Sequence, residues 1–122
     1  GKSVPTAGMD TEMKAALGEM DRCRLGVVFI TETSGRLRGI ITDGDIRRMV
    51  VQKMNIHAST AGALMTANPK HVHQATPLYE ALNIMETHQI TVLPAVDESA
   101  VVVGALHLHD ILGKGALKFN PM

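Results

Sequence analysis

Hydrophobic side chains recur along the chain in two different periods, and these periods alternate in the same order twice. A spacing of three and four residues, typical of an amphipathic helix, places apolar residues at Met13, Ala16, Leu17 and Met20 and again at Leu78, Ala81, Leu82 and Met85. Each such helix precedes two short aliphatic and β-branched runs, at residues 26–31 and 37–42 and then at 92–96 and 101–106. The pattern therefore predicts a helix followed by a strand pair, twice.

The segments around these runs indicate the remaining elements. Residues 32–36 are expected to connect the first strand pair as a hairpin. Each strand pair is followed by a predicted closing helix, at about 44–53 and about 108–117, with a connection over 54–59 and a short helical turn near 61–65.

The two halves align with each other at a constant offset of 65 residues, without a gap. Identical residues meet along the whole length, for example Thr11 and Thr76, Met20 and Met85, Val27 and Val92, Gly39 and Gly104, and Asp45 and Asp110. One register kept this long indicates an internal repeat. Each half alone has too little core to be secure, so we expect 1–54 and 55–122 to pack as one α/β (α+β) module with approximate two-fold symmetry.

Local signals mark where the two amphipathic helices begin. Thr11 and Thr76 are expected to cap the free N–H groups of the first turn, and Pro77 suits a first-turn position. Thr60–Met65 precede the second copy, and their counterparts in the first copy would carry numbers below 1. Together with Gly1 in place of an initiator Met, this predicts that the first copy is truncated and that the chain comes from a longer protein.

Composition excludes several classes of protein. Among 122 residues, 45% are hydrophobic but only 2% aromatic, so the core must be aliphatic and rich in the eight methionines. Lys plus Arg and Asp plus Glu both number 12, which leaves no net field for nucleic acid, and the few aromatic residues offer no stacking platform. Cys23 is the only cysteine, and no apolar run is long enough for a membrane span. We therefore expect a cytoplasmic protein without disulfides.

Residues with possible chemistry gather where the last strand of the first copy turns into its closing helix, at residues 39–48. Thr42 can bind phosphate beside a helix N-terminus, Asp45 can accept the two hydroxyls of a ribose, and Arg47 or Arg48 can neutralise phosphate. A purely structural interpretation remains open at this point. Thr42 or Asp43 is also an ordinary N-cap, Asp45 an ordinary acid in a first helical turn, and the arginines an ordinary solvated face.

The same stretch resembles the cystathionine-β-synthase-type (CBS) domain, which occurs as tandem β-α-β-β-α pairs. The family signature is a glycine after a hairpin, aliphatic residues, Ser or Thr, two spacers and Asp; the first copy matches with Gly39, Thr42 and Asp45. The second copy keeps Gly104 and Asp110 but has His107 in place of the hydroxyl residue. The resemblance implies a cleft between the copies in which Asp holds ribose and Ser or Thr approaches phosphate.

A narrower resemblance is to the C-terminal CBS pair of bacterial arabinose-5-phosphate isomerases. Residues 42–48 look like that group's T-D-G-D-L-R-R, and residues 104–110 like its G-V-L-H-M-H-D. This resemblance implies a non-catalytic regulatory module of a sugar-phosphate isomerase in lipopolysaccharide (Kdo) synthesis, linked to an N-terminal sugar-isomerase domain. It implies a homodimer of CBS pairs and a regulatory ligand that is an adenine nucleotide, AMP or ATP, or the end product CMP-Kdo. The expected contacts also include Val4, Pro5, Asp43, Lys70, His71 and His109.

Six histidines support an alternative, a metal site. His71 and His73, like His107 and His109, are spaced so that a strand would present both imidazoles on one face, and two converging pairs can hold zinc. Pure dimerisation is a third possibility. An enzyme is disfavoured because the chain has no phosphate loop, dinucleotide fingerprint or nucleophile elbow, and Asp43 and Asp45 have no nearby His or Lys to form a dyad.

Overall fold

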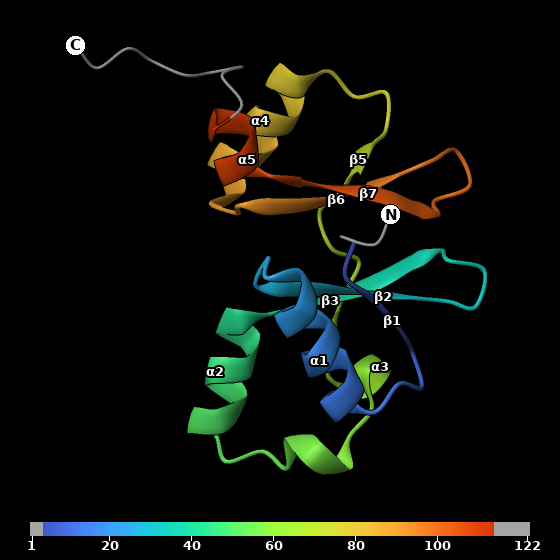
Figure 1. Ribbon diagram of the computed structural model, residues 1–122, viewed down its shortest axis with the longest axis vertical. Coiled ribbons are helices and arrows are strands. Elements are labelled where there is room, and N and C mark those ends of the chain that lie inside the picture. The colour runs from blue at the N-terminus through green and yellow to red at the C-terminus, as the bar shows by residue number, and fades with distance from the viewer. Residues whose placement is uncertain (1–3, 114–122) are drawn as a thin grey trace.

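The computed structural model describes residues 4–113 as two similar units, whose small sheets face each other and carry their helices on the outside (Figure 1). The first unit contains β1 (Thr6–Gly8), α1 (Met13–Cys23), β2 (Val27–Thr31), β3 (Leu37–Thr42) and α2 (Asp43–Val51). A linker follows with the 3₁₀ turn η1 (Ile56–Ala58), α3 (Ala61–Leu64) and β4 (Thr66–Ala67). The second unit contains β5 (Val72–His73), α4 (Leu78–His88), β6 (Val92–Val96), β7 (Val102–His107) and α5 (Leu108–Gly113).

The strand registers repeat at the offset that the sequence predicts. β1 runs parallel to β2 and β2 antiparallel to β3, and β5, β6 and β7 pair in the same way. Val27 pairs with Thr42 as Val92 pairs with His107, and both hairpins have a register shift at the same place, between Ile30 and Thr31 and between Ala95 and Val96. The α/β repeat architecture is therefore confirmed down to its irregularities.

The two units are joined at the tips of their hairpins around a local two-fold axis. Leu37 N donates to Ala100 O at 3.0 Å, and Val102 N donates to Gly35 O at 3.0 Å. These four residues exchange roles under the 65-residue offset, because 35 corresponds to 100 and 37 to 102. The axis thus passes between Arg36 and Val101, which form an isolated antiparallel bridge.

Three clusters of buried side chains make up the core, one in each unit and one between the units. In the first unit the cluster joins Met13, Ala16 and Met20 of α1 to the outer face of β2 and β3; in the second, Ala81 and Met85 of α4 do the same against β6. The third cluster forms between the facing sheets, where Phe29, Val27 and Val92 are buried against partly buried aliphatic residues of both copies. Aliphatic and methionine packing thus holds both units together, as the composition predicts.

The linker after α2 covers the first unit. Ala61 N donates to Thr11 O at 2.8 Å, Gly62 N donates to Met9 O at 2.8 Å, and Ala61 is completely buried in the first cluster. β4 then pairs with β3 at Gly39 and Ile40, which gives the first sheet a fourth strand. Residues 56–67 therefore pack on the sheet that precedes them in the chain.

Two details of the helix starts differ from expectation. Glu12 and Pro77, rather than Thr11 and Thr76, are the N-cap residues of α1 and α4, and neither helix has a side-chain cap. The two threonine hydroxyls instead accept hydrogen bonds from the N–H groups three residues earlier, of Gly8 at 2.9 Å and His73 at 3.1 Å, and so close the preceding turn. The part of the predicted final helix beyond residue 113 lies outside the described residues. Between residues 4 and 113, no helix has both the length and the apolar character needed to span a bilayer.

Candidate functional site

A cleft of about 720 Å³ opens between the two units at the end of β2 and β3 opposite the hairpin tips. This volume lies within the range of small-molecule binding sites. Four chain segments line it: the start of β2, the junction of β3 with α2, the linker after β4, and the turn between α4 and β6. Both copies contribute, as expected for a site shared between repeats.

Thr42 and Asp45 form a reciprocal capping box at the start of α2. The Thr42 hydroxyl accepts a hydrogen bond from Asp45 N at 3.1 Å, and the Asp45 carboxylate accepts one from Thr42 N at 2.9 Å. Asp45 also bonds to the Arg48 guanidinium and is 9% exposed. Thr42 lines the cleft and keeps its own hydroxyl hydrogen to donate, whereas Asp45 is turned into its helix and does not line the cleft.

Asp43, the first residue of α2, lines both the cleft and a neighbouring outer pocket that it shares with Asp21 and Arg24. The side chain rests against Gly26: a methyl group on Gly26 would meet Asp43 Oδ2 at 2.9 Å, and Gly26 has a φ of +73° that favours glycine. Asp43 N donates to Gly26 O at 3.0 Å, which fixes the helix start against the beginning of β2. No hydrogen bond or ion pair to the Asp43 carboxylate occurs within residues 4–113.

Three cations surround the start of α2, and two of them line the cleft. Arg47 and Lys70 approach it from α2 and from the linker, and neither forms an ion pair with another described residue. Arg48 instead pairs with Asp45 and lies on the outer side of α2 beside Val51 and Gln52. Of the two arginines in the motif, Arg47 is therefore the one placed to meet a ligand in the cleft.

The rest of the cleft combines aliphatic walls with two amide side chains that sequence reasoning missed. The aliphatic lining residues are Leu25, Val27, Ile40, Pro69, Ile90 and Val92. Asn68 and Gln89 both line the cleft and both adopt left-handed backbone conformations, with φ of 55° and 54°. The surroundings suit a flat apolar group with polar edges. Asn is a common turn residue that tolerates the left-handed conformation, so the sequence alone could have indicated a turn at Asn68. That Asn68 and Gln89 line the same cleft depends on how the two copies pack.

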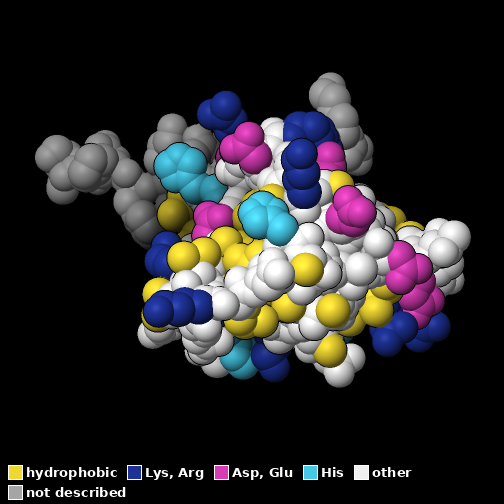
Figure 2. Space-filling view, turned by 90° about the horizontal axis from the view of Figure 1, so that it is seen from below, with side chains coloured by type: hydrophobic (Ala, Val, Ile, Leu, Met, Phe, Trp, Pro, Cys, Tyr) yellow, Lys and Arg dark blue, Asp and Glu magenta, His cyan; other side chains and the backbone are white. Residues whose placement is uncertain are grey.

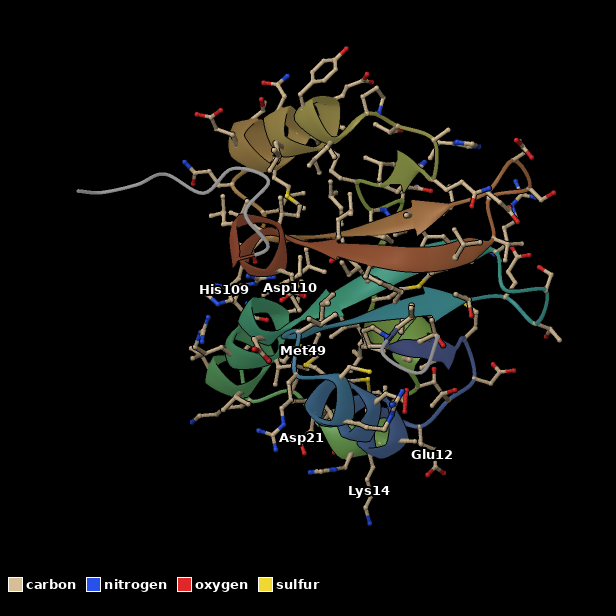
Figure 3. The ribbon with its side chains drawn as sticks, turned by 45° about the horizontal axis from the view of Figure 1, so that its top comes forward. Glu12, Lys14, Asp21, Met49, His109 and Asp110 are labelled. Carbon is tan, nitrogen blue, oxygen red and sulfur yellow. The ribbon has the colours of Figure 1, made fainter. Side chains whose placement is uncertain are left out.

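The motif residues of the second copy lie at the corresponding end of β7. Figure 3 places His109 and Asp110 at the end of α5 that faces the first unit. The His107 and His109 rings stand edge to face at 6.2 Å, and His107 Nδ1 is buried without a hydrogen-bond partner among the described residues. Asp110 is exposed.

Val4 and Pro5 lie near the first copy's sheet rather than in the cleft. Pro5 O accepts from Phe29 N at 2.8 Å, and Val4 packs in the cluster between the sheets. Under the 65-residue offset Val4 and Pro5 correspond to Pro69 and Lys70 of the cleft. Pro5 is itself fully buried, so this correspondence is one of sequence position only.

The two histidine pairs do not converge. His73 lies in β5 beside Val96, at one end of β6, whereas His107 pairs with Val92 at the other end. His71 precedes β5 and bonds to Pro69 O at 3.1 Å, and it lines an outer pocket with His73 and Glu98 rather than the cleft. His109 belongs to α5, so neither pair shows two imidazoles on one strand face. Residues 4–113 contain no group of three or more His, Cys, Asp and Glu side chains that could hold a metal.

Comparison with known proteins agrees with the predicted resemblance. The family model for the CBS domain matches residues 1–52 and 61–116. Arabinose 5-phosphate isomerase KdsD of Pseudomonas aeruginosa is 37% identical over 117 residues, which cover 96% of this chain and 36% of that protein. KdsD of Escherichia coli K12 is 30% identical over 96% of this chain and 35% of that protein. The chain thus spans about a third of the length of the curated relatives it matches.

Solved structures show the same fold. A CBS domain protein of Pyrobaculum aerophilum complexed with AMP has a TM-score of 0.81 at 21% identity and covers 92% of this chain and 86% of that one. The CBS domain pair of MJ0100, in complex with 5′-methylthioadenosine and S-adenosylmethionine, has a TM-score of 0.78 at 27% identity, with coverage of 91% and 90%.

Proposed function

The chain belongs to the CBS domain family as a tandem pair, and on that premise we propose that it is a regulatory module that binds a phosphorylated ribose ligand in the cleft between its copies. The observation that carries the proposal is the composition of this one cleft. A hydroxyl at a helix start, two cations and one carboxylate surround an aliphatic slot, and none of these three charged groups has a partner among residues 4–113. Phosphate, sugar hydroxyls and a base are the groups that such a lining complements.

The phosphate end of the ligand is assigned to Thr42, Arg47 and Lys70. A phosphate there would accept hydrogen bonds from the Thr42 hydroxyl and from both cations. The N-terminus of α2, a helix of nine residues, adds a favourable dipole at the same place. The base would occupy the aliphatic part of the cleft beside Asn68 and Gln89.

We propose an adenine nucleotide, AMP or ATP, as the first ligand to test. Support comes from the MJ0100 pair, which is 27% identical and is solved with two adenosine compounds. CMP-Kdo is the second ligand to test. The relatives named arabinose 5-phosphate isomerase support it, because the end product of a pathway often inhibits an early enzyme of that pathway. Both ligands present a ribose 5′-phosphate, so the contacts proposed above serve either.

The parent protein is proposed to be a cytoplasmic arabinose-5-phosphate isomerase in which this pair regulates a separate sugar-isomerase domain. The proposal rests on the identities of 30–37% to proteins of that name. Two such pairs are proposed to dimerise through their helices. Figure 2 looks onto the face that carries α1 to α3, where hydrophobic side chains spread over the middle and charged ones lie mostly toward the rim. Val50 and Val51 of α2 are 61% and 76% exposed.

A calorimetric and thermal-shift panel of AMP, ATP, CMP and CMP-Kdo against the 122-residue chain tests the proposal. A ligand that binds the folded chain alone raises its melting temperature in proportion to the logarithm of its concentration. We expect at least one compound of the panel to bind, with the affinity reduced at least tenfold by Arg47→Leu. If all four compounds leave the melting temperature unchanged at millimolar concentration, the sensing proposal is wrong and dimerisation alone remains.

A further inference from the structure

The linker after α2 covers one side of the first unit, and among the described residues the corresponding side of the second unit is open. In the first unit β4 adds a fourth strand beside Gly39, whereas the second sheet has three strands and ends at β7. A methyl group on Gly39 would lie 2.7 Å from Met65 Cγ of the linker, while one on its counterpart Gly104 meets no described atom within 4 Å. The edge of β7 is therefore accessible where the edge of β3 is paired.

Two backbone carbonyls of the second unit lack the hydrogen bonds that their counterparts receive. In the first unit Met9 O and Thr11 O each accept from an N–H group of the linker at 2.8 Å. The 65-residue offset places Gln74 O and Thr76 O at these positions, and neither accepts a hydrogen bond from any residue between 4 and 113. Because each carbonyl is a strong acceptor, a further chain segment can bond to this turn as the linker bonds to the first.

Apolar side chains on the same side of the second unit are exposed where the first unit buries them. Met13 and Ile41 are completely buried in the first cluster, which also contains Ala61 of the linker. Their counterparts are Leu78, which is 37% exposed, and Leu106, which is only partly buried. The second unit thus presents an apolar surface at the place that the linker covers in the first.

Gly104 itself indicates a close neighbour. Glycine weakens the interior of a strand and often marks a place where another backbone approaches. Within the described residues only Gly26 and Gly35 are glycines with a positive φ, so the backbone at Gly104 does not require glycine. At Gly39 the close neighbour is the linker, and a counterpart of the linker accounts for glycine at 104 in the same way.

We propose that this open side of the second unit, formed by the β7 edge, Gln74, Thr76 and Leu78, is the docking site of the chain segment that enters the module from the preceding domain of the parent protein. The two-fold relation between the copies makes a counterpart of the linker the expected occupant, and the offset gives the counterpart of residues 61–67 the numbers −4 to 2. The chain spans 36% and 35% of two relatives named isomerase, so most of their length lies outside it. The inference rests on the proposed parent protein and not on its ligand.

The first unit specifies the chemistry of this segment. A methyl group on Gly62 would lie 2.7 Å from Met9 O, so the linker needs a very small residue where it approaches that carbonyl. Ala61 is completely buried, and Leu64 packs against the first cluster. We therefore expect small residues at positions −4 and −3 and an apolar one at −1, followed by a short strand on β7. A segment docked on the second unit that continues into β1 of the first is held by both units, so a change in their separation moves the anchor of the preceding domain.

Hydrogen–deuterium exchange of backbone amides tests the docking without any ligand. The full-length parent protein and the 122-residue chain are compared at equal pH and concentration, and peptides that cover residues 74–80 and 102–106 are followed by mass spectrometry. We expect exchange in both regions to be at least tenfold slower in the parent protein, because the new backbone hydrogen bonds open only when the segment detaches. The counterpart regions 9–15 and 37–41, which the linker already covers, should exchange within about threefold of each other in the two proteins.

Gly104→Val identifies the segment as the cause of the protection. Its side chain would occupy the place that corresponds to Met65, so in the parent protein the variant should return exchange at 102–106 to the rate of the 122-residue chain. Gly18→Ala is the control, because an added methyl group there also meets no described atom within 4 Å but lies on α1; it should leave exchange at 102–106 unchanged.

Three results would overturn the inference. Exchange at 102–106 that is equally fast in the two proteins would show that nothing docks there. Slow exchange already present in the 122-residue chain would show that a second copy or another part of this chain covers β7, and slow exchange that survives Gly104→Val would assign the protection to a different surface of the parent protein. Each of these results leaves the ligand proposal to be decided by its own panel.

Discussion

Replacing Asp45 should destabilise the fold, because its carboxylate is committed to the structure. Asp45→Ala removes a charged hydrogen bond to Thr42 N, a favourable acid in the first turn of α2 and a partner of Arg48. A hydrogen bond to a charged group contributes about 1.5–3 kcal/mol to stability. Because Thr42 is only partly buried, water can bond to its N–H in the variant and offset part of this loss. The interaction of the carboxylate with the helix dipole contributes about 0.3–1 kcal/mol more. The Arg48 side chain is 67% exposed, so its pair adds at most about 0.5 kcal/mol. We expect a loss of about 2 kcal/mol in the free energy of unfolding.

The variants at this position separate the contributions. Asp45→Asn keeps an oxygen that accepts from Thr42 N and should lose only about 0.5–1 kcal/mol. Asp43→Asn is the matched control, since its carboxylate has no hydrogen bond within the described residues, and it should stay within about 0.5 kcal/mol of wild type. Urea unfolding followed by far-ultraviolet circular dichroism is the appropriate assay, because the chain has no Trp and its single Tyr79 is 74% exposed. If Asp45→Ala unfolds at the wild-type urea concentration, the capping box contributes nothing and the structural role assigned to Asp45 is wrong.

Two further predictions concern packing and pH. Gly39→Ala should lower the free energy of unfolding by about 1–3 kcal/mol, because the new methyl group would lie 2.7 Å from Met65 Cγ. Its counterpart Gly104→Ala, whose methyl group meets no described atom within 4 Å, should lower it by less than about 1 kcal/mol. Equal losses in urea unfolding would contradict the packing of the linker on the first sheet. The hydrogen bond from Arg22 lowers the pKa of Glu19 below its ordinary value of 4.5, so its stabilising effect is present above that value and is lost as pH falls through the lowered pKa. Since the Arg22 side chain is exposed and that of Glu19 is partly exposed, water screens the pair, and Glu19→Gln should remove at most about 0.5 kcal/mol at pH 7 and nothing at pH 2. A larger loss at pH 2 would reverse the expected sign.

The sequence predicted the long elements because their patterns are local. Helices α1 and α4 follow from residues spaced three and four apart, and strands β2, β3 and β6 from aliphatic runs bounded by turns. Strands β1, β4 and β5 have two or three residues each, too few to show an alternation, and they form because a longer neighbour offers them a free edge. The position of residues 56–67 on the first sheet likewise depends on tertiary contacts of Ala61 and Gly62.

The site was predicted as a segment but not as a set of side chains. Of the segment Thr42 to Arg48 that the resemblance indicated, Thr42, Asp43, Gly44 and Arg47 line the cleft. Successive helical residues differ in direction by about 100°, so whether Asp43 or Asp45 faces the cleft depends on where the helix begins. The capping box fixes that start at Thr42 and turns Asp45 inward. The spacing of His71 from His73 was misleading for a similar reason, since only His73 is in a strand.

The positions of the joint and the cleft limit how a ligand in this site can act. The backbone bonds between Gly35, Leu37, Ala100 and Val102 hold the units together at the hairpin tips, whereas the cleft lies at the other end of β2 and β3. A small rotation about the tips changes the separation of α2 from the turn at residues 89–91, and both line the cleft. A ligand that contacts both sides therefore favours one separation over the others.

A ligand at a hundred times its dissociation constant contributes about 2.7 kcal/mol to the arrangement that alone binds it, enough to shift an equilibrium about a hundredfold. Binding of one ligand per chain in this cleft should give a graded response with a Hill coefficient of one, and any steeper response requires coupling between sites.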